Sequence, residues 1–181
     1  YIIKSSLDYC YEVIVIDGHS TDSTASLCKN LGVNVYYDNK KGKGDAIRLG
    51  IKKASKNLLV FIDADMSHNP QDIPKIAYPI FKGHADHVVG SRPKGGSDEL
   101  HGDLSKFIRM IGSDIITLGI NYRFNVRLTD SQNGFRAIKK SVAENINLKE
   151  NITTIEQEMT IKTLKHKYII KEVPVHEYAR Q

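Results

Sequence analysis

Tryptophan is absent from this sequence of 181 residues, and cysteine occurs only twice. Cys10 and Cys28 lack the paired spacing that zinc sites and small disulfide-bonded domains require. We interpret them as small core residues, suited to a reducing cytosol. A cysteine-rich secreted scaffold is therefore excluded.

A long hydrophobic run is also missing. Spanning a bilayer takes ~18 consecutive apolar residues, whereas the nearest candidate, residues 107–120, is interrupted by Arg109, Ser113 and Asp114. No signal peptide is recognisable. The chain begins at Tyr1 rather than at a methionine, and we expect it to enter a strand almost at once. We therefore expect that residues precede it.

Neither sign of charge dominates the composition. Lys and Arg exceed Asp and Glu by 26 to 21, which gives a net charge of +5 and a pI of about 9.1. This modest excess suggests anionic partners only in general terms. Aromatic and basic residues are not interleaved, so we expect no nucleic-acid partner. The length fits one globular domain with a sizeable core.

Apolar runs alternate with segments of helical periodicity, which is typical of an α/β protein. The expected strands cover residues 12–17, 33–37, 58–62, 86–90, 135–138 and 168–175. The expected helices cover residues 21–31, 44–55, 70–81, 103–121 and 154–167. We predict one domain over residues 1–181, with a nucleotide-binding half at about 1–90 and an acceptor half at about 91–181.

The helix expected at 103–121 carries an apolar face. The residues that share this face are Leu104, Phe107, Ile108, Ile111, Ile115 and Leu118. Such a face either packs inside the protein or contacts lipid, and we expect core packing.

Acidic residues stand where the expected strands end. Asp17 closes one apolar strand, and the segment LLVFIDADMSHNP (58–70) runs from five apolar residues into Asp63 and Asp65. Ligands of open α/β sheets bind beyond the carboxyl ends of the strands. Two neighbouring carboxylates suit Mg²⁺ or Mn²⁺ that bridges a diphosphate. The simpler interpretation is a helix-capping turn, with Asp65 or Ser67 as the cap.

A basic, glycine-containing segment, KKGKGDA (40–46), lies between an expected strand and an expected helix. Its glycines allow backbone amides to approach a ligand, and the following helix N-terminus favours negative charge. The segment lacks the P-loop pattern. It could equally be a solvated basic turn.

Three further polar segments follow in the second half. Arg92 ends Gly90-Ser91-Arg92, and Arg109 lies further on; the planar guanidinium suits phosphate oxygens. The polar loop 129–136 precedes a strand. Glu156-Gln157-Glu158 falls within a helix, where we expect a solvated face.

Six segments of the sequence, taken together and in order, form one pattern. They are VIVIDGHSTDST (13–24), KGKGDA (41–46), FIDADMSHNP (61–70), VVGSRPKGG (88–96), LTDSQNGFRAIKK (128–140) and IKEVPVHEYAR (170–180). Together they cover nearly the whole chain. In this order the chain resembles the family-two glycosyltransferases of GT-A fold, and within them the dolichol-phosphate mannose synthase-like, or polyprenyl-phosphate glycosyltransferase, branch. The resemblance implies a Rossmann-like mixed sheet flanked by helices.

The resemblance also implies roles for individual residues, on the donor side and on the acceptor side. The residues implied to bind the nucleotide-sugar are Asp17, Lys41, Gly44, Asp63 and Ala64. Those implied to hold the metal, Mg²⁺ or Mn²⁺, are Asp63 and Asp65. The residues implied to act at the reaction centre are Asp65, Asp130, Arg92 and Arg109. Those implied to hold an acceptor phosphate are Arg92, Arg109 and Arg136.

The sequence departs from the family pattern in two places. Gly18 and His19 follow Asp17 where the family commonly has a second acid. The family's opening strand, which ends in Pro-x-x-Asn-Glu and helps to bind the base, is missing from this chain. We therefore expect a sheet that lacks its first strand.

The resemblance implies an inverting, metal-assisted transfer of a sugar from a GDP- or UDP-sugar to a polyprenyl or dolichyl phosphate, at the cytoplasmic face of a membrane. A lipid phosphate is already an anion, so it needs positioning more than deprotonation. A glycan hydroxyl acceptor would instead need a base, for which Asp130 is the candidate. The Q-x-x-R-W motif of processive synthases is impossible without tryptophan. A phosphatase with Asp63 as nucleophile fits poorly, and a non-catalytic sugar-nucleotide or lipid-phosphate binding module is the alternative outside enzymes.

Overall fold

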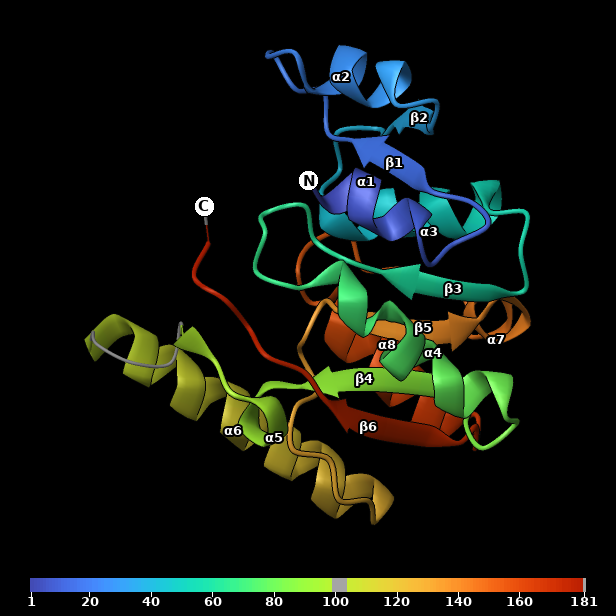
Figure 1. Ribbon diagram of the computed structural model, residues 1–181. Helices are drawn as coiled ribbons and strands as arrows, with labels where there is room; N and C mark the ends of the chain where they lie inside the picture. Colours follow the sequence, from blue (N-terminus) through green and yellow to red (C-terminus); the bar gives the residue numbers. More distant parts are fainter. Residues whose placement is uncertain (99–103, 181) are drawn as a thin grey trace.

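The computed structural model describes residues 1–98 and 104–180, and the side chains of residues 1–98 and 111–180. Six strands form in the described residues, and each lies within one or two residues of an expected strand. They are β1 (Ile14–Asp17), β2 (Asn34–Tyr37), β3 (Leu58–Phe61), β4 (His87–Ser91), β5 (Arg136–Lys139) and β6 (Ile170–Pro174). Their mixed pairing, with helices on both faces, confirms the expected fold class (Figure 1).

The strands pair in two groups. β1 pairs with β2 in parallel, and the other four strands follow the order β3-β5-β4-β6. β5 is antiparallel to both of its neighbours, whereas β4 and β6 are parallel. The carboxyl ends of β3, β4 and β6 therefore meet at one edge, on the left in Figure 1.

Pairing is interrupted between β1 and β3, because each of them has a single paired neighbour in the described residues. The expectation that the sheet lacks its opening strand stays a prediction. The chain does not enter a strand almost at once, because the helix α1 (Ile2–Leu7), for which no element was expected, precedes β1. Side-chain alternation is too short there to separate a strand from a helix.

The expected helices are all present in the described residues, with their ends shifted. They are α2 (Thr24–Asn30), α3 (Lys43–Lys53), α4 (Ile73–Phe81, preceded by the 3₁₀ turn η1, Pro70–Asp72), α6 (Leu104–Phe124) and α8 (Ile155–Lys165). Besides α1, two more short helices were not expected: α5 (Arg92–Gly95) and α7 (Lys140–Asn145). Helices of four to six residues give too few turns for a periodic signal.

The core has two parts, one on each face of the four-stranded sheet. Successive strand residues point to opposite faces, so Leu59 and Ile138 pack under α7 and α8, whereas Val60 and Ala137 pack against α4. Ile76 of α4 is fully buried in the second part. The sheet is thus packed against helices on both of its faces.

α6 does not bury the face that the sequence suggested. In the described part of the helix, Ile111, Ile115 and Leu118 are exposed, and the buried residues are Thr117 and Ile120. α6 extends past the edge of the sheet in Figure 1. For the described part of this face the expectation of core packing is therefore wrong, and the side chains of Leu104, Phe107 and Ile108 lie outside the described residues. None of the helices in the described ranges has both the length and the hydropathy needed to cross a membrane.

The core assignment predicts the effect of truncating Ile76. Ile76→Ala should lower the free energy of unfolding by about 2–5 kcal/mol, because it removes buried contacts and leaves a cavity. Leu27→Ala is the matched control, since Leu27 is exposed on α2, and it should change stability by less than about 0.5 kcal/mol. Urea denaturation measures both values. Equal stabilities of the two variants would contradict the packing.

Candidate active site

The acids predicted from the sequence lie at the carboxyl edge of the strands. Asp17 ends β1, and Asp63 and Asp65 follow β3. Arg92 follows β4 directly, and the loop 129–135 reaches the same edge because Arg136 pairs with Phe61. The fold therefore brings the two halves of the sequence together at one edge.

Asp63 is held by a lysine from the basic glycine segment. Lys43 Nζ lies 2.9 Å from each carboxylate oxygen of Asp63 and 2.7 Å from Glu156 Oε1. Burial opposes the charged form of Lys43, but the two carboxylates outweigh it and raise the pKa of the ammonium. Lys43 thus acts as a fixed positive charge between two acids.

Glu156 corrects the expectation of a solvated helix face. Its side chain is buried, and Oε2 has no hydrogen-bond partner. Glu158 caps the 149–150 backbone instead of pointing freely into solvent. Glu156, Thr160 and Thr163 follow one another at helical spacing on the buried face of α8. That spacing is the sequence signal which would have identified Glu156.

Gly134 makes room for the Lys43–Asp63 pair. A Cβ atom at this position would lie 2.5 Å from Asp63 Oδ2 and 3.1 Å from Lys43 Nζ. No side chain fits there unless the pair moves. The glycine of the segment Gly134-Phe135-Arg136 therefore contributes by its small size.

Asp65 has a different set of partners. Its Oδ1 accepts hydrogen bonds from Ser67 N and Ser67 Oγ, and its Oδ2 lies 3.2 Å from Arg180 Nε. Burial raises the pKa of Asp65, but the Ser67 hydrogen bonds and Arg180 outweigh it and lower the pKa. Helix capping is done by Asn69, whose side chain accepts from Gln71 N at the start of η1. Ala64 is exposed between the two acids.

The glycines of segment 40–46 do not open the backbone to a ligand as expected. Gly44 N donates to Asn151 O at 2.8 Å, and a Cβ on Gly44 would lie 2.1 Å from Glu150 O. These glycines admit the 150–151 backbone instead. Lys41 is exposed beside them.

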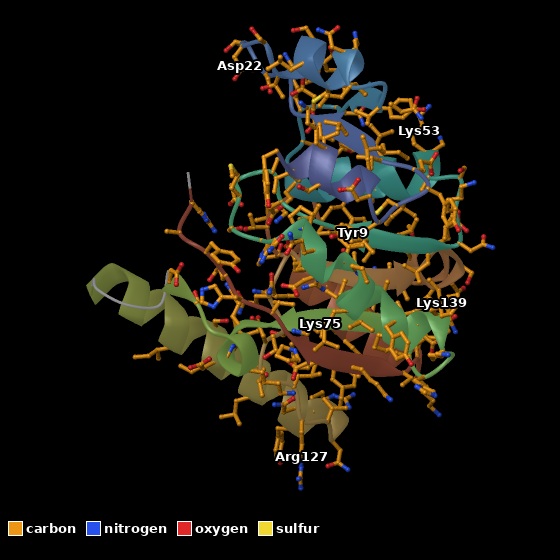
Figure 2. All side chains as sticks on the ribbon, in the orientation of Figure 1. Tyr9, Asp22, Lys53, Lys75, Arg127 and Lys139 are labelled. Atoms are coloured by element: carbon orange, nitrogen blue, oxygen red, sulfur yellow. The ribbon has the colours of Figure 1, made fainter. Side chains whose placement is uncertain are left out.

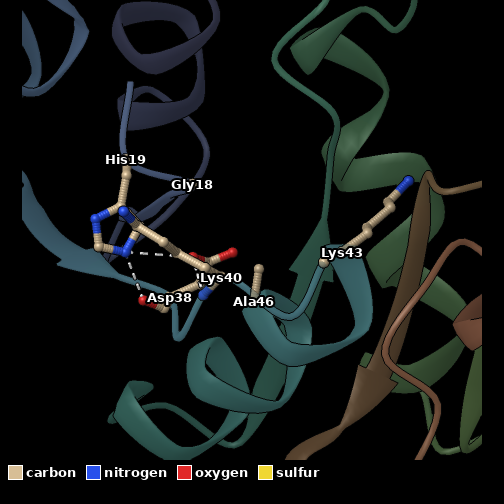
Figure 3. A pocket seen from close by; sticks show the side chains of 7 residues that line it. Gly18, His19, Asp38, Lys40, Lys43 and Ala46 are labelled. Carbon is tan, nitrogen blue, oxygen red and sulfur yellow. Dashed lines mark hydrogen bonds and ion pairs between the residues drawn. The ribbon is translucent and has the colours of Figure 1, made fainter. Parts of the chain in front are cut away.

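An open pocket of about 630 Å³ lies between the ends of β1 and β2 and the start of α3 (Figure 3). Its lining residues are Gly18, His19, Asp38, Lys40, Gly42, Lys43 and Ala46. Figure 3 shows the Lys43 ammonium pointing away from this pocket. His19 Nε2 lies 2.8 Å from Asp38 O, so His19 stands on the pocket wall next to Gly18, at the place where the sequence departs from the family pattern.

Asp17 stands near this pocket with one unused oxygen. Its Oδ1 accepts hydrogen bonds from Ser20 N and Ser20 Oγ, whereas Oδ2 is buried without a partner. A buried carboxylate oxygen without a partner is costly. A hydroxyl or ring N–H of a bound nucleoside would satisfy it.

Arg92 is clamped at the end of β4. Its Nε donates to Asp130 Oδ2 at 2.6 Å and its Nη2 to Asp130 Oδ1 at 3.0 Å, while Nη1 lies 3.3 Å from Glu177 Oε1. Burial opposes the charge, but the two carboxylates raise the pKa of Arg92 further above its usual range. Asp130 also accepts from Gln132 N and Asn133 N, so neither of its oxygens lacks a partner.

Arg136 does not reach an acceptor phosphate. Its side chain is only 1% exposed, and it donates to the carbonyl oxygens of Asn133, Glu156 and Ser131. Burial lowers its pKa to about 10. Arg136 ties the 131–136 loop to α8, and the expected phosphate contact does not fit this geometry. The side chain of Arg109 lies outside the described residues.

The donor set at Asp63 and Asp65 fits a divalent cation. Both side chains are about one-third exposed, and each carboxylate faces a cationic side chain. Among the side chains described, no three or more His, Cys, Asp or Glu residues form a ready-made metal cluster. Mg²⁺ is commonly held by one or two carboxylates together with substrate phosphates. Two acids at an open edge match that arrangement.

Comparisons with known proteins agree with this geometry. The family model described as glycosyl transferase family 2 matches residues 2–146. A UDP-N-acetylglucosamine–dolichyl-phosphate N-acetylglucosaminyltransferase of Methanococcus voltae is 30% identical over 96% of this chain and 78% of its own. A dolichol-phosphate mannosyltransferase of Pyrococcus furiosus is 33% identical over 91% of this chain, which spans 47% of the relative.

Among solved structures, glucosyl-3-phosphoglycerate synthase from Mycobacterium tuberculosis, in complex with Mn²⁺, UDP and glucosyl-3-phosphoglycerate, is similar in fold. The TM-score is 0.77 at 20% identity, over 99% of this chain and 66% of that chain. A likeness at this identity concerns the fold.

The tight space at Gly134 predicts a steric effect. Gly134→Ala should lower the free energy of unfolding by about 1–3 kcal/mol, because the new methyl group displaces Asp63 from Lys43. Gly119→Ala is the control: nothing lies within 4 Å of a Cβ there, and alanine favours a helix. Urea denaturation distinguishes them. Wild-type stability of Gly134→Ala would contradict the described contact.

Proposed function

The chain belongs to glycosyltransferase family 2, and we propose that it moves a sugar from a GDP- or UDP-sugar to a polyprenyl or dolichyl phosphate with inversion at the anomeric carbon. The observation that carries this proposal is the placement of Asp63 and Asp65 at the same sheet edge as Arg92. Acids for a metal-bound diphosphate and a fixed guanidinium for a second phosphate thus occupy one site. Two relatives are named as dolichyl- or dolichol-phosphate transferases.

The donor lies against the first half of the chain, about residues 1–90. Asp17 contacts the nucleoside, and Asp63 and Asp65 hold Mg²⁺ or Mn²⁺. The metal, when bound, offsets the negative charge of the departing nucleoside diphosphate. Lys43 and Arg180 offset the negative charge of the two carboxylates. They hold the two carboxylates in place at the edge of the sheet.

The acceptor lies against the second half, about residues 91–181. A phosphate monoester is mostly ionised at neutral pH, because its second pKa is about 6. One of its oxygens attacks the anomeric carbon and forms the new C–O bond, while the bond to the β-phosphate breaks and the diphosphate leaves with the electron pair. No protein base is needed. Arg92 positions the phosphate, and its longer contact to Glu177 is the one that the phosphate replaces.

Asp130 orients Arg92 in this proposal. Its carboxylate already accepts two hydrogen bonds from the guanidinium and two from the loop backbone. A base for a glycan hydroxyl would need a free oxygen. The lipid-phosphate acceptor therefore suits this geometry better than a hydroxyl acceptor. We propose that the enzyme works at a membrane surface, on the cytoplasmic side.

The metal assignment predicts the behaviour of Asp65→Asn. A neutral amide is a weak ligand for a hard cation, so Mn²⁺-dependent binding of GDP or UDP should weaken at least ~10-fold. Asp22 is exposed near α2, at the top of the molecule in Figure 2, and Asp22→Asn should bind GDP or UDP as wild type does. Isothermal titration calorimetry with and without Mn²⁺ gives both affinities. Unchanged metal-linked affinity in Asp65→Asn would refute the assignment.

The acceptor assignment predicts a separation of binding from turnover. Arg92→Ala should lower kcat/KM for polyprenyl phosphate roughly 10²-fold while nucleotide affinity stays near wild type. Arg92→Lys should recover only part of the loss, because an ammonium lacks the planar fork.

Asp130→Asn serves as the comparison for the acceptor. With a phosphate acceptor, Asp130→Asn should lower kcat/KM less than Arg92→Ala does, because it only weakens the hydrogen bonds that orient Arg92. With a hydroxyl acceptor, it should be the more damaging of the two. Wild-type transfer to polyprenyl phosphate by Arg92→Ala would mean that the acceptor assignment is wrong.

A further inference from the structure

Glu172 is a buried acid of β6 that the proposed reaction does not use. Its side chain is only 2% exposed, although it stands within a strand, between Lys171 and Val173. Val173 packs with the part of the core that lies against α4. Successive strand residues point to opposite faces, so Glu172 points to the other face of the sheet. Burying a carboxylate is costly unless it is paired and hydrogen-bonded, so the partners of Glu172 indicate its role.

Four groups donate hydrogen bonds to the carboxylate of Glu172. Thr129 N and Asp130 N each lie 2.7 Å from Oε1. Thr129 Oγ1 lies 3.0 Å from Oε2, and Lys94 Nζ lies 2.7 Å from the same oxygen. A carboxylate has about four lone-pair positions that accept hydrogen bonds. All of them are therefore used by the protein, and Glu172 joins α5 to the loop that contains Asp130.

A chain of hydroxyl groups extends this contact to the end of β4. Thr129 gives its hydroxyl proton to Glu172, so Ser91 Oγ, which lies 2.6 Å from Thr129 Oγ1, must be the donor in that pair. Ser91 Oγ in turn accepts from Lys94 N at 3.2 Å. Ser91 is fully buried and directly precedes Arg92. Glu172 thus orders the hydrogen bonds around the residue next to Arg92.

The two segments that Glu172 joins meet at the proposed acceptor site. Arg92 is the first residue of α5, and both oxygens of Asp130 accept from its guanidinium. We propose that Glu172 is a positioning residue of the acceptor site: its carboxylate fixes the backbone of Asp130, and Asp130 then sets the direction of the Arg92 guanidinium. This inference rests on the proposed function for the role of Arg92 toward a phosphate acceptor.

Asp86 provides a matched control for a purely stabilising acid. Its Oδ1 lies 2.7 Å from Lys139 Nζ, and its Oδ2 accepts from Ile169 N at 2.8 Å. Asp86 is thus also paired with a lysine and a backbone amide, but it precedes β4, and Lys139 lies at the right of Figure 2, away from the carboxyl end of β4. Urea denaturation should show that Glu172→Gln and Asp86→Asn are both less stable than wild type. Only Glu172→Gln should disturb Arg92.

The first readout is an NMR signal that needs no substrate. Arg92 Nε–H donates to Asp130 Oδ2 at 2.6 Å, and its hydrogen exchange with water reports how firmly this pair is held. The signal is assigned by its absence from Arg92→Lys. In Glu172→Gln the exchange should be at least ~10-fold faster, because the amide nitrogen of glutamine donates hydrogen bonds and cannot accept them. In Asp86→Asn it should match wild type. Unchanged exchange in Glu172→Gln would overturn the proposal.

The second readout is turnover with farnesyl phosphate, a short polyprenyl phosphate. Glu172→Gln should lower kcat/KM roughly 10-fold, because a misdirected guanidinium positions the phosphate poorly. Mn²⁺-dependent affinity for GDP or UDP should match wild type, since the partners of Glu172 belong to the acceptor half of the chain. Asp86→Asn should transfer the sugar as wild type does. A wild-type kcat/KM in Glu172→Gln would mean that Glu172 only stabilises the fold.

Thr129→Val decides the question if Glu172→Gln does not fold. Valine keeps the shape of threonine but lacks the hydroxyl that donates to Glu172 Oε2. Exchange of Arg92 Nε–H should then be at least ~3-fold faster than in wild type. Wild-type exchange in Thr129→Val would in that case overturn the proposal.

Failure of the proposed function gives a different result. If wild type does not use farnesyl phosphate, but Glu172→Gln accelerates the exchange of Arg92 Nε–H, the positioning of Arg92 by Glu172 stands and the acceptor assignment fails. If wild type uses farnesyl phosphate, and Glu172→Gln matches Asp86→Asn in both exchange and turnover, the function stands and the positioning role is refuted.

Discussion

Pairing of the strand-end carboxylates with cationic side chains is the constraint on which the rest of this structure depends. Asp63 and Asp65 stand two residues apart, and like charges so close oppose one another unless a cation lies nearby. Lys43 reaches Asp63 from α3, and Arg180 reaches Asp65 from the far end of the described chain. Gly134 leaves the space that the first pair needs. Strand pairing brings distant parts of the sequence to one edge, and the ion pairs join these parts there.

Much of the fold could be predicted from the sequence, because its signals are local. The strands were found from short apolar runs, and their ends moved by one or two residues. What failed were features set by distant packing. The apolar face of α6 with Ile111, Ile115 and Leu118 has the spacing of a core helix. Spacing alone does not show whether that face packs against a sheet. Residues 2–7 form a helix that was not expected, since so short a segment carries no decisive period.

The candidate site also has a part that the sequence predicts and a part that it does not. Asp17, Asp63, Asp65 and Arg92 were identified because each directly follows or ends an apolar strand, and the fold places strand ends together. The interaction partners of these residues could not be predicted from the neighbouring sequence. Arg136 looked available for a phosphate, yet burial commits its guanidinium to backbone carbonyls. The acid pairs with Lys43 and Arg180 arise from contacts between segments that are far apart in the sequence.

The reaction itself is the most direct test of the central claim that one edge of the sheet joins a metal-bound donor to an anionic phosphate acceptor. The protein is incubated with a nucleotide-sugar, Mn²⁺ and a polyprenyl phosphate, and the product is examined by mass spectrometry and by ¹H and ³¹P NMR. The account predicts a polyprenyl glycosyl phosphate whose anomeric configuration is opposite to that of the donor. A product of retained configuration, or release of free sugar with the lipid phosphate unchanged, would contradict it.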